Sequence, residues 1–176
     1  MTTPSTSEKK QALLELAERI RSRWNCWLYP TEPKVQGFLG VGAIFIVGDQ
    51  PSTDRWEVTH PHRRAFYDLL ATEGAGDFHL TDIYKRRGLS GELRNSMPED
   101  FDEHLELFRI EVDLLRPRTI LAMGRDAHRL LLTHTPELTS LLIRVWHFGT
   151  VRHVKLKEFQ ASLRRGINAA RRREQE

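Results

Sequence analysis

The chain has 176 residues, of which 39% are hydrophobic and 29% are charged, and its formal net charge is +3. These values predict one compact domain over residues 1–176 and exclude both a disordered chain and a pair of catalytic domains. Cys26 is the only cysteine, which excludes a disulfide and an all-cysteine metal site. The sequence has neither a signal-peptide core nor an apolar run of membrane-spanning length, so we expect a cytoplasmic protein without membrane contact.

The N-terminal part of the sequence begins with a polar stretch, residues 1–8, which we expect to be flexible. Apolar side chains then recur at helical spacing from Leu13 to Trp24 and predict a first amphipathic helix. The stretch from Cys26 to Gly42 is interrupted by prolines and glycines, which is typical of a long loop.

From residue 43 onward, short apolar runs alternate with segments of helical periodicity. The predicted strands are AIFIVG (43–48), FHLTDIY (78–84), TILAMG (119–124) and LIRVWHF (142–148). The predicted helices cover residues 63–70, 101–115, 125–132 and 157–173. This alternation predicts the α/β class, as a three-layer α/β/α sandwich with a central four-stranded parallel sheet. Ligands of such sheets bind at the carboxyl ends of the strands, so the expected site lies in the loops beginning at Gly48, Asp82, Gly124 and His147.

Four segments between residues 43 and 153 combine these strands and loops with reactive side chains. They are VGDQPSTD (47–54), HLTDIYKRR (79–87), LLRPRTILAMGRDAHRLLL (114–132) and VWHFGTVRH (145–153). In this order they resemble the motifs of the uracil-DNA glycosylase superfamily: the water-orienting loop, the base-recognition strand, the third strand with its helix, and the second catalytic motif. The resemblance implies a uracil-DNA glycosylase-like fold and an enzyme that hydrolyses the bond between a base and its deoxyribose in DNA.

Two departures from the family pattern narrow this expectation. One branch of the superfamily holds an iron-sulfur cluster on four cysteines, whereas this chain has Cys26 alone and Arg86 after Lys85. We therefore expect no cluster, no metal ion and no other cofactor. In the last motif, Phe148 and Gly149 replace the proline and serine of the family.

Breaking an N-glycosidic bond builds positive charge on the sugar and negative charge on the leaving base. By the resemblance, Asp49 would orient the attacking water and stabilise the cationic sugar, as carboxylates do in other glycosidases. Gln50 would help to hold that water, and His147 would donate a hydrogen bond to O2 of the base. These three residues are the predicted catalytic group.

Asp82 stands where relatives that excise uracil carry asparagine. An ionised carboxylate only accepts hydrogen bonds, and cytosine offers a donor, the N4 amine, on the corresponding edge. We therefore hypothesise that the base is a modified cytosine, 5-substituted or glycosylated, because cutting ordinary cytosine would destroy the host's own DNA. Such an enzyme suits antiviral defence, whereas excision of uracil in base-excision repair is the alternative.

An extruded base needs a stacking partner, and the DNA around it needs contacts to its phosphates. The candidates for stacking are aromatic residues in or after the first catalytic loop: Trp56, His62 and Phe66. The candidates for contact with DNA follow strands at the same edge of the sheet: Lys85, Arg86, Arg87, Arg125, Val151 and Arg152. Val151 and Arg152 take the place of the side chain that relatives insert into the vacated stack. We expect a monomer whose partner is DNA.

Each candidate also has a structural interpretation. Asp49 follows a glycine at a strand end, where aspartate often stabilises a turn or caps a helix. Asp82 is near enough in sequence to pair with Lys85, and His147 beside Trp146 is compatible with a hydrogen-bonded residue at the end of a strand.

Two further patterns favour structural roles. His60 and His62 have a spacing found in metal sites, but no further ligand pattern accompanies them. The run of three arginines at 171–173 suits the C-terminal end of a helix and indicates a solvated face. A catalytically silent DNA-binding module is the competing function, and a flavodoxin-like small-molecule enzyme is disfavoured because no glycine-rich phosphate loop follows the first strand.

Overall fold

The computed structural model describes residues 4–24, 26–51, 57, 59–87, 99–149 and 155–175. Its centre is a four-stranded sheet in the order β2-β1-β3-β4, and every neighbouring pair is parallel. The strands are β1 (Ile44–Gly48), β2 (His79–Asp82), β3 (Thr119–Met123) and β4 (Leu142–Val145). The predicted α/β class with a central parallel sheet is confirmed.

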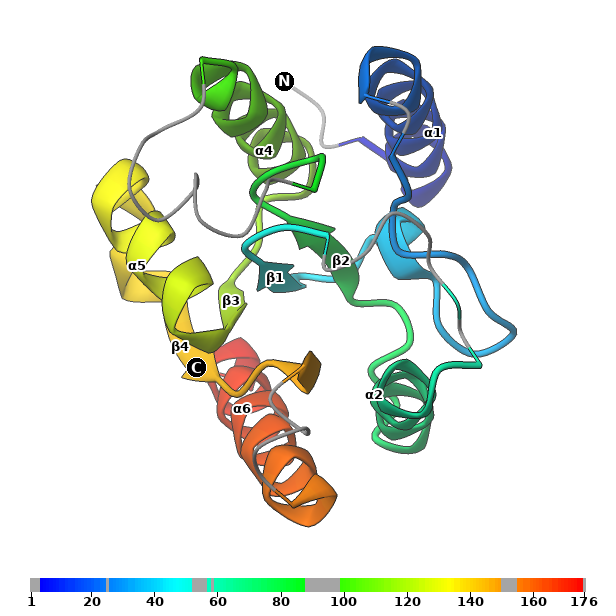
Figure 1. Ribbon diagram of the computed structural model, residues 1–176, viewed down its shortest axis with the longest axis vertical. Helices are drawn as coiled ribbons and strands as arrows, with labels where there is room; N and C mark the ends of the chain where they lie inside the picture. The colour runs from blue at the N-terminus through cyan, green and yellow to red at the C-terminus, as the bar shows by residue number, and fades with distance from the viewer. Residues whose placement is uncertain are drawn as a thin grey trace.

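The connections between the strands are mostly helical. The helices are α1 (Thr6–Trp24), α2 (Pro61–Thr72), α4 (Phe101–Leu115), α5 (Gly124–His134) and α6 (Leu156–Gln175), with short 3-10 helices η1 (Gly37–Leu39) and η2 (Pro136–Leu141). In Figure 1, α1 and α4 lie on one side of the sheet and α2 and α6 on the other. None of the helices in the described part of the chain combines the length and apolar character needed to span a bilayer.

The side chains of β1 alternate between two cores, one on each face of the sheet. Ile44 and Ile46 pack in the core formed with α2 and α6, whereas Phe45 and Val47 pack in the core formed with α1, α4 and α5. All four are completely buried, which explains why β1 is an unbroken apolar run rather than an alternating one. Both faces of the sheet are therefore covered, as a three-layer sandwich requires.

The structure corrects two predicted boundaries. Residues 6–8 belong to α1, because Ser5 and Glu8 cap its start reciprocally: the Ser5 N–H donates to Glu8 Oε2 at 2.7 Å and the Glu8 N–H to Ser5 Oγ at 3.3 Å. The fourth strand ends at Val145, not at 148, because the Trp146 N–H donates to Ser162 Oγ of α6 instead of joining the sheet. Residues 146–149 thereby become a loop that can present side chains at the strand end.

A buried charged network fixes the end of β2 to α4. The Lys85 ammonium lies 2.7 Å from Glu111 Oε1 and donates to Thr81 Oγ1 and to the Asp82 carbonyl oxygen at 2.8 and 2.6 Å. The other oxygen of Glu111 lies 3.2 Å from His79 Nε2. Since the Lys85 and Glu111 side chains have no exposure to solvent, each charge depends on its partners inside the protein.

Removing one partner of this network should strongly destabilise the fold. We expect Glu111→Ala to lower the free energy of unfolding by about 3–5 kcal/mol, because the Lys85 ammonium remains buried without an anion. Urea denaturation followed by circular dichroism measures this change. Asp113→Ala, at an exposed acid of the same helix, is the control and should alter stability by less than about 0.5 kcal/mol. Equal effects of the two substitutions would show that the network does not hold β2 in place.

Candidate active site

The predicted catalytic residues lie at one edge of the sheet. Because all four strands are parallel, their carboxyl ends meet at this edge, and the register places Gly48 beside Asp82 and Met123 beside Val145. Asp49 follows β1, and His147 follows β4 with β3 between them. Two steps between adjacent strands span about 10 Å, so the strands that carry Asp49 and His147 end about this far apart at the same edge of the sheet.

The close approach of Asp82 to β1 requires a glycine at position 48. A β-carbon there would overlap Asp82 Oδ1 and come within 3.4 Å of the Tyr29 hydroxyl oxygen. The missing side chain lets the carboxyl of Asp82 lie over the end of β1, next to Asp49. The backbone continues this contact, since the Tyr84 N–H donates to the Asp49 carbonyl oxygen at 2.9 Å.

The carboxyl of Asp82 is held in its neutral form. Asp82 is only 5% exposed, and burial together with the nearby charge of Asp49 raises its pKa to about 8. Lys85 and a hydrogen bond from the Tyr29 hydroxyl to Oδ1, 3.2 Å long, act in the opposite direction but do not offset these effects. At pH 7 the group is therefore mostly a carboxylic acid, with one oxygen that accepts and one O–H that donates. The sequence-based inference treated Asp82 as a carboxylate, whereas burial and the charge of Asp49 favour the neutral acid.

The imidazole of His147 is also neutral, and its proton position is defined by the backbone. Burial lowers the pKa of His147 to about 4. The Gly149 N–H donates to His147 Nδ1 at 2.9 Å, so Nδ1 carries the lone pair and the proton resides on Nε2. His147 therefore presents an N–H donor that needs no protonation. Gly149 makes this possible, because a β-carbon at that position would lie 2.9 Å from Nδ1.

A stack of rings supports His147 from the core side. Its ring lies 4.3 Å from that of Phe148, and Phe148 in turn stacks on Phe66 at 5.3 Å between ring centroids. Phe66 has no exposure to solvent, so the prediction that it stacks on an extruded base is wrong: both its position and its neighbours make it a core residue. The ring of Phe148 thus orients the imidazole.

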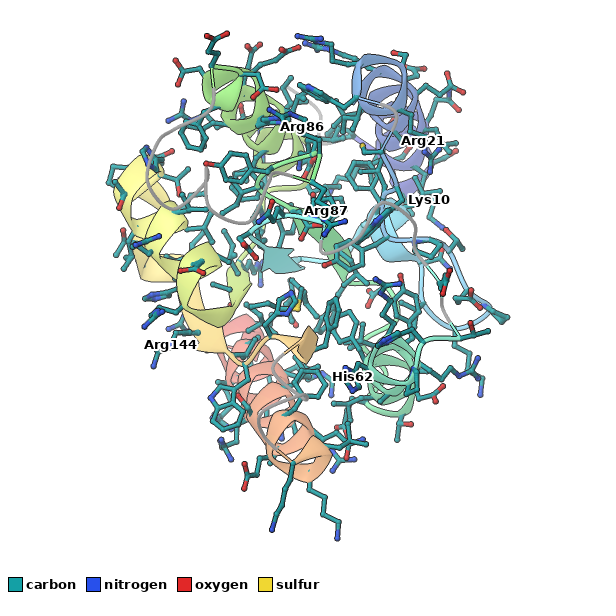
Figure 2. All side chains as sticks on the ribbon, viewed as in Figure 1. Lys10, Arg21, His62, Arg86, Arg87 and Arg144 are labelled. Carbon is teal, nitrogen blue, oxygen red and sulfur yellow. The ribbon has the colours of Figure 1, made fainter. Side chains whose placement is uncertain are left out.

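The predicted DNA-contacting cations differ in their surroundings. Lys85 is buried in the network with Glu111, so the prediction that it contacts a DNA backbone is wrong. Arg86 forms two hydrogen bonds to the Asp100 carboxylate, at 2.9 and 3.1 Å, at the start of α4. Arg87 is exposed after β2, nearer the middle of the sheet in Figure 2, and Arg125 is exposed in the first turn of α5. For Arg87 and Arg125, contact with a DNA phosphate stays a prediction.

Of the remaining predicted residues, Gln50 and His62 lie in the described part of the chain. Gln50 lies directly after Asp49 and is partly buried, and His62 lies in the first turn of α2 with its ring edge-on to His60 at 5.0 Å (Figure 2). Within the described residues, no group of three or more His, Cys, Asp or Glu side chains is arranged to hold a metal ion. Three predicted residues lie outside the described part of the chain: Trp56, Val151 and Arg152.

Sequence reasoning missed two residues that define this site. Tyr29 lies in the long loop after α1, where no periodicity marks it, and reaches Asp82 because Gly37, with a φ of 61°, folds the loop back onto it. Glu111 had a detectable signal, since it falls three residues after Phe108 and four before Leu115, on the apolar face of α4. An acid at a core position of an amphipathic helix indicates a buried cationic partner.

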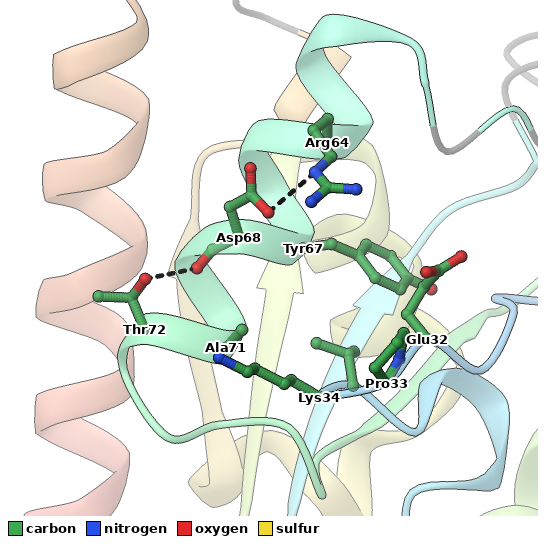
Figure 3. Close-up of a pocket in the computed structure, with 9 residues that line it drawn as sticks. Glu32, Pro33, Lys34, Arg64, Tyr67, Asp68, Ala71 and Thr72 are labelled. Carbon is green, nitrogen blue, oxygen red and sulfur yellow. Dashed lines mark hydrogen bonds and ion pairs between the residues drawn. The ribbon is translucent and has the colours of Figure 1, made fainter.

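A separate hollow of about 450 Å³ lies away from this edge, between α2 and the segment 32–35 (Figure 3). Its charged side chains include Glu32 and Lys34, and Arg64 pairs with Asp68 at 3.0 Å within α2. Lys34 contacts Gly76, which precedes β2, so the hollow opens toward the amino ends of the strands. Neither Asp49 nor Asp82 lines it.

No protein-family model matches this chain, and a comparison with curated proteins gives no match either. The chemistry of the site is therefore inferred from the arrangement of Asp49, Asp82 and His147 and from the motifs around them.

The raised pKa of Asp82 can be measured directly. We expect the side-chain carboxyl carbon of Asp82, assigned with Asp82→Asn and followed by NMR, to titrate with a midpoint near 8 because the acid is buried beside Asp49. Tyr29→Phe should raise the midpoint further, since the lost hydrogen bond favours the ionised form. A midpoint near the ordinary value of 3.8 would show that the carboxyl is charged and solvated.

Proposed function

We propose that this protein is a DNA glycosylase that hydrolyses the N-glycosidic bond of a pyrimidine extruded from DNA, leaving an abasic site. One observation carries the proposal: a carboxyl group held neutral, Asp82, lies at one strand edge with a second carboxyl group, Asp49, and a neutral imidazole donor, His147. Base removal requires these three kinds of group: a base reader, an anion near the sugar and a hydrogen-bond donor for the leaving base.

Asp49 supplies the negative charge near the sugar. As the bond from the base to C1′ breaks, positive charge develops on the deoxyribose, and a carboxylate over C1′ stabilises that charge. The same carboxylate orients a water molecule toward C1′, with Gln50 as a second hydrogen-bonding group. The bond that breaks is C1′–N1, and its electron pair leaves with the base. The oxygen of water bonds to C1′, and one proton of that water passes to the Asp49 carboxylate and from there to the departed base anion.

His147 stabilises the departing base. The leaving pyrimidine carries its negative charge largely on O2 and N1, and a neutral imidazole with the proton on Nε2 donates a hydrogen bond to O2 without transferring the proton. The Gly149 N–H and the Phe148 ring fix this ring before the substrate binds, so little reorganisation is needed during the reaction.

Asp82 reads the Watson–Crick edge of the base. A carboxylic acid donates to N3 of cytosine through its O–H and accepts from the N4 amine through its carbonyl oxygen, so it is complementary to a cytosine edge. We therefore retain a modified cytosine as the proposed base, and antiviral defence as the process that such an activity serves. The same acid in the reversed orientation fits O4 and N3–H of uracil, which is the second candidate.

The proposed partner is DNA, bound by a protein monomer. Arg87 follows β2, and Arg125 lies in the first turn of α5. Both would supply positive charge for the phosphates on either side of an extruded nucleotide. Phosphate contacts of this kind position the strand, whereas Asp82 would contact the edge of the base.

A panel of oligonucleotides tests the activity. Duplexes with a single uracil, cytosine, 5-hydroxymethylcytosine or glucosylated 5-hydroxymethylcytosine are incubated with the protein, and abasic sites are read as alkali-labile breaks. We expect breaks at one modified cytosine, and a loss of about 10²- to 10⁴-fold in Asp49→Asn because the sugar cation and the water lose their carboxylate.

The exposed acid Asp113 provides the matched control, because Asp113→Asn removes the same charge far from the site. It should retain full activity, while Asp49→Asn should retain DNA binding. If only the uracil duplex is cut, uracil and not a modified cytosine is the base that the protein excises. Binding of DNA without breaks in any duplex would contradict the proposed reaction and leave a silent binding module.

The pH dependence of excision tests the role of Asp82. Because the neutral acid is the reading form and its pKa is about 8, we expect the single-turnover rate to fall as the pH rises through about 8. Asp82→Asn cannot ionise, so any remaining activity should lose this alkaline limb. An unchanged alkaline limb in Asp82→Asn would show that another group controls the rate.

A further inference from the structure

A second hollow, of about 510 Å³, lies between the outer strand β4 and helix α6. Three arginines and an exposed tryptophan line it: Arg144, Arg165, Arg172 and Trp146. Arg165 and Arg172 are seven residues apart on α6 and therefore share one face of the helix. Arg144 comes from β4, and Figure 2 shows it at the outer side of the sheet. β4 and α6 thus both contribute positively charged side chains to this hollow.

The packing of α6 on β4 brings these groups close together. A β-carbon at Gly166 would overlap the side chain of Val145, so the glycine allows the helix backbone to approach the strand directly. Ser162, one turn earlier on α6, accepts the N–H of Trp146 at 3.1 Å and fixes the backbone from which the indole projects. The hollow is therefore built on two rigid elements.

The three arginines of the hollow are not neutralised within the described part of the chain. Their neighbours on α6 are engaged: Arg164 pairs with Glu73 at 2.7 Å, Arg171 donates to the Glu73 carbonyl oxygen, and Arg173 donates to the Ser140 carbonyl oxygen. By contrast, no described carboxylate forms an ion pair with the three arginines that line the hollow, and no acid lines it. Like charges held together in this way repel one another and favour a polyanionic ligand.

Trp146 adds a second chemical feature that the ligand of this hollow should match. It is 41% exposed although its backbone is anchored, and it lines the same hollow as the three arginines. An inorganic anion does not stack on an indole ring, whereas a nucleobase does. The combination of fixed cations and an open aromatic ring is the recognition chemistry of single-stranded nucleic acid.

We propose that this hollow binds a nucleotide of a single strand, with the base stacked on Trp146 and the flanking phosphates held by Arg144, Arg165 and Arg172. The site is separate from the candidate active site and does not depend on base excision, since it uses none of the residues that would break the glycosidic bond. It gives the protein a second contact with nucleic acid, on the outer edge of the sheet.

Binding of fluorescein-labelled oligothymidylate, measured by fluorescence anisotropy, tests the proposal. Thymine is not a proposed substrate, so turnover does not interfere. We expect the variant R144Q/R165Q/R172Q to bind at least about tenfold more weakly, with a slope of log K against log salt that is smaller in magnitude by about 2, as three lost phosphate contacts require. The matched control is R19Q/R21Q/R23Q on α1, which removes the same charge from the other helical layer and should bind almost as the wild type does.

Substitutions of the indole test the stacking. We expect Trp146→Ala to weaken binding by about tenfold and Trp146→Tyr to retain most of it, because tyrosine keeps an aromatic face. The indole N–H signal of Trp146, assigned with Trp146→Phe, should shift when oligothymidylate is added and should not shift with inorganic phosphate. An oligomer of deoxyribose phosphate without bases cannot stack on the indole. The wild-type protein should therefore bind it about as weakly as Trp146→Ala binds oligothymidylate.

Three outcomes would overturn the proposal: equal weakening in the two triple-arginine variants, an unshifted indole signal, or a change of oligomeric state in Trp146→Ala without a change in nucleic-acid binding. The last would make the hollow a contact between copies of the chain.

Thermal unfolding of each variant confirms that it is folded. If no oligonucleotide is cut but these variants still lose binding, the proposed glycosylase activity fails while the nucleotide site stands.

Discussion

The buried carboxyl of Asp82 is the constraint around which the edge of the sheet is organised. It lies over Gly48, beside Asp49, and its only hydrogen-bond donor among the described side chains is the Tyr29 hydroxyl. With so little solvation and a second acid nearby, ionisation is disfavoured, and the group keeps a proton to about pH 8. A neutral acid in this position both donates and accepts, which is the hydrogen-bonding pattern that the proposed contact with a pyrimidine edge requires.

The Lys85–Glu111 pair makes this arrangement possible. Lys85 binds the Asp82 carbonyl oxygen and therefore sets the backbone at the end of β2, but an unpaired ammonium so close would also ionise the Asp82 side chain. Glu111 provides the partner of that ammonium, and its own charge raises the pKa of Asp82. The network thus holds Asp82 in place while favouring its neutral form. At the end of β4, burial keeps His147 neutral, and the Gly149 N–H bound to Nδ1 places the ring proton on Nε2.

The fold was predictable because its strands are buried on both faces and appear as unbroken apolar runs, such as AIFIVG and TILAMG. The parallel order then places the ends of β1, β2 and β4 at one edge, where Asp49, Asp82 and His147 were expected. Contacts made by single side chains across the chain were not predictable. Lys85 looks like a surface cation until Glu111 is placed opposite it, and Phe66 looks like a stacking partner until the core closes around it. The protonation of Asp82 depends on such contacts, so local sequence carries no sign of it.

The central proposal is that one extruded pyrimidine binds with its edge on Asp82 and its O2 on His147. It is tested most directly by a crystal structure of the protein with a duplex in which the pyrimidine cut in solution carries a 2′-fluoroarabinose sugar, since the fluorine disfavours positive charge on the sugar and slows bond breakage. We expect the Watson–Crick edge of the base to meet the Asp82 carboxyl, O2 to accept from His147 Nε2, and Asp49 to face C1′. A base that remains stacked in the duplex, or that occupies another part of the protein, would contradict the account.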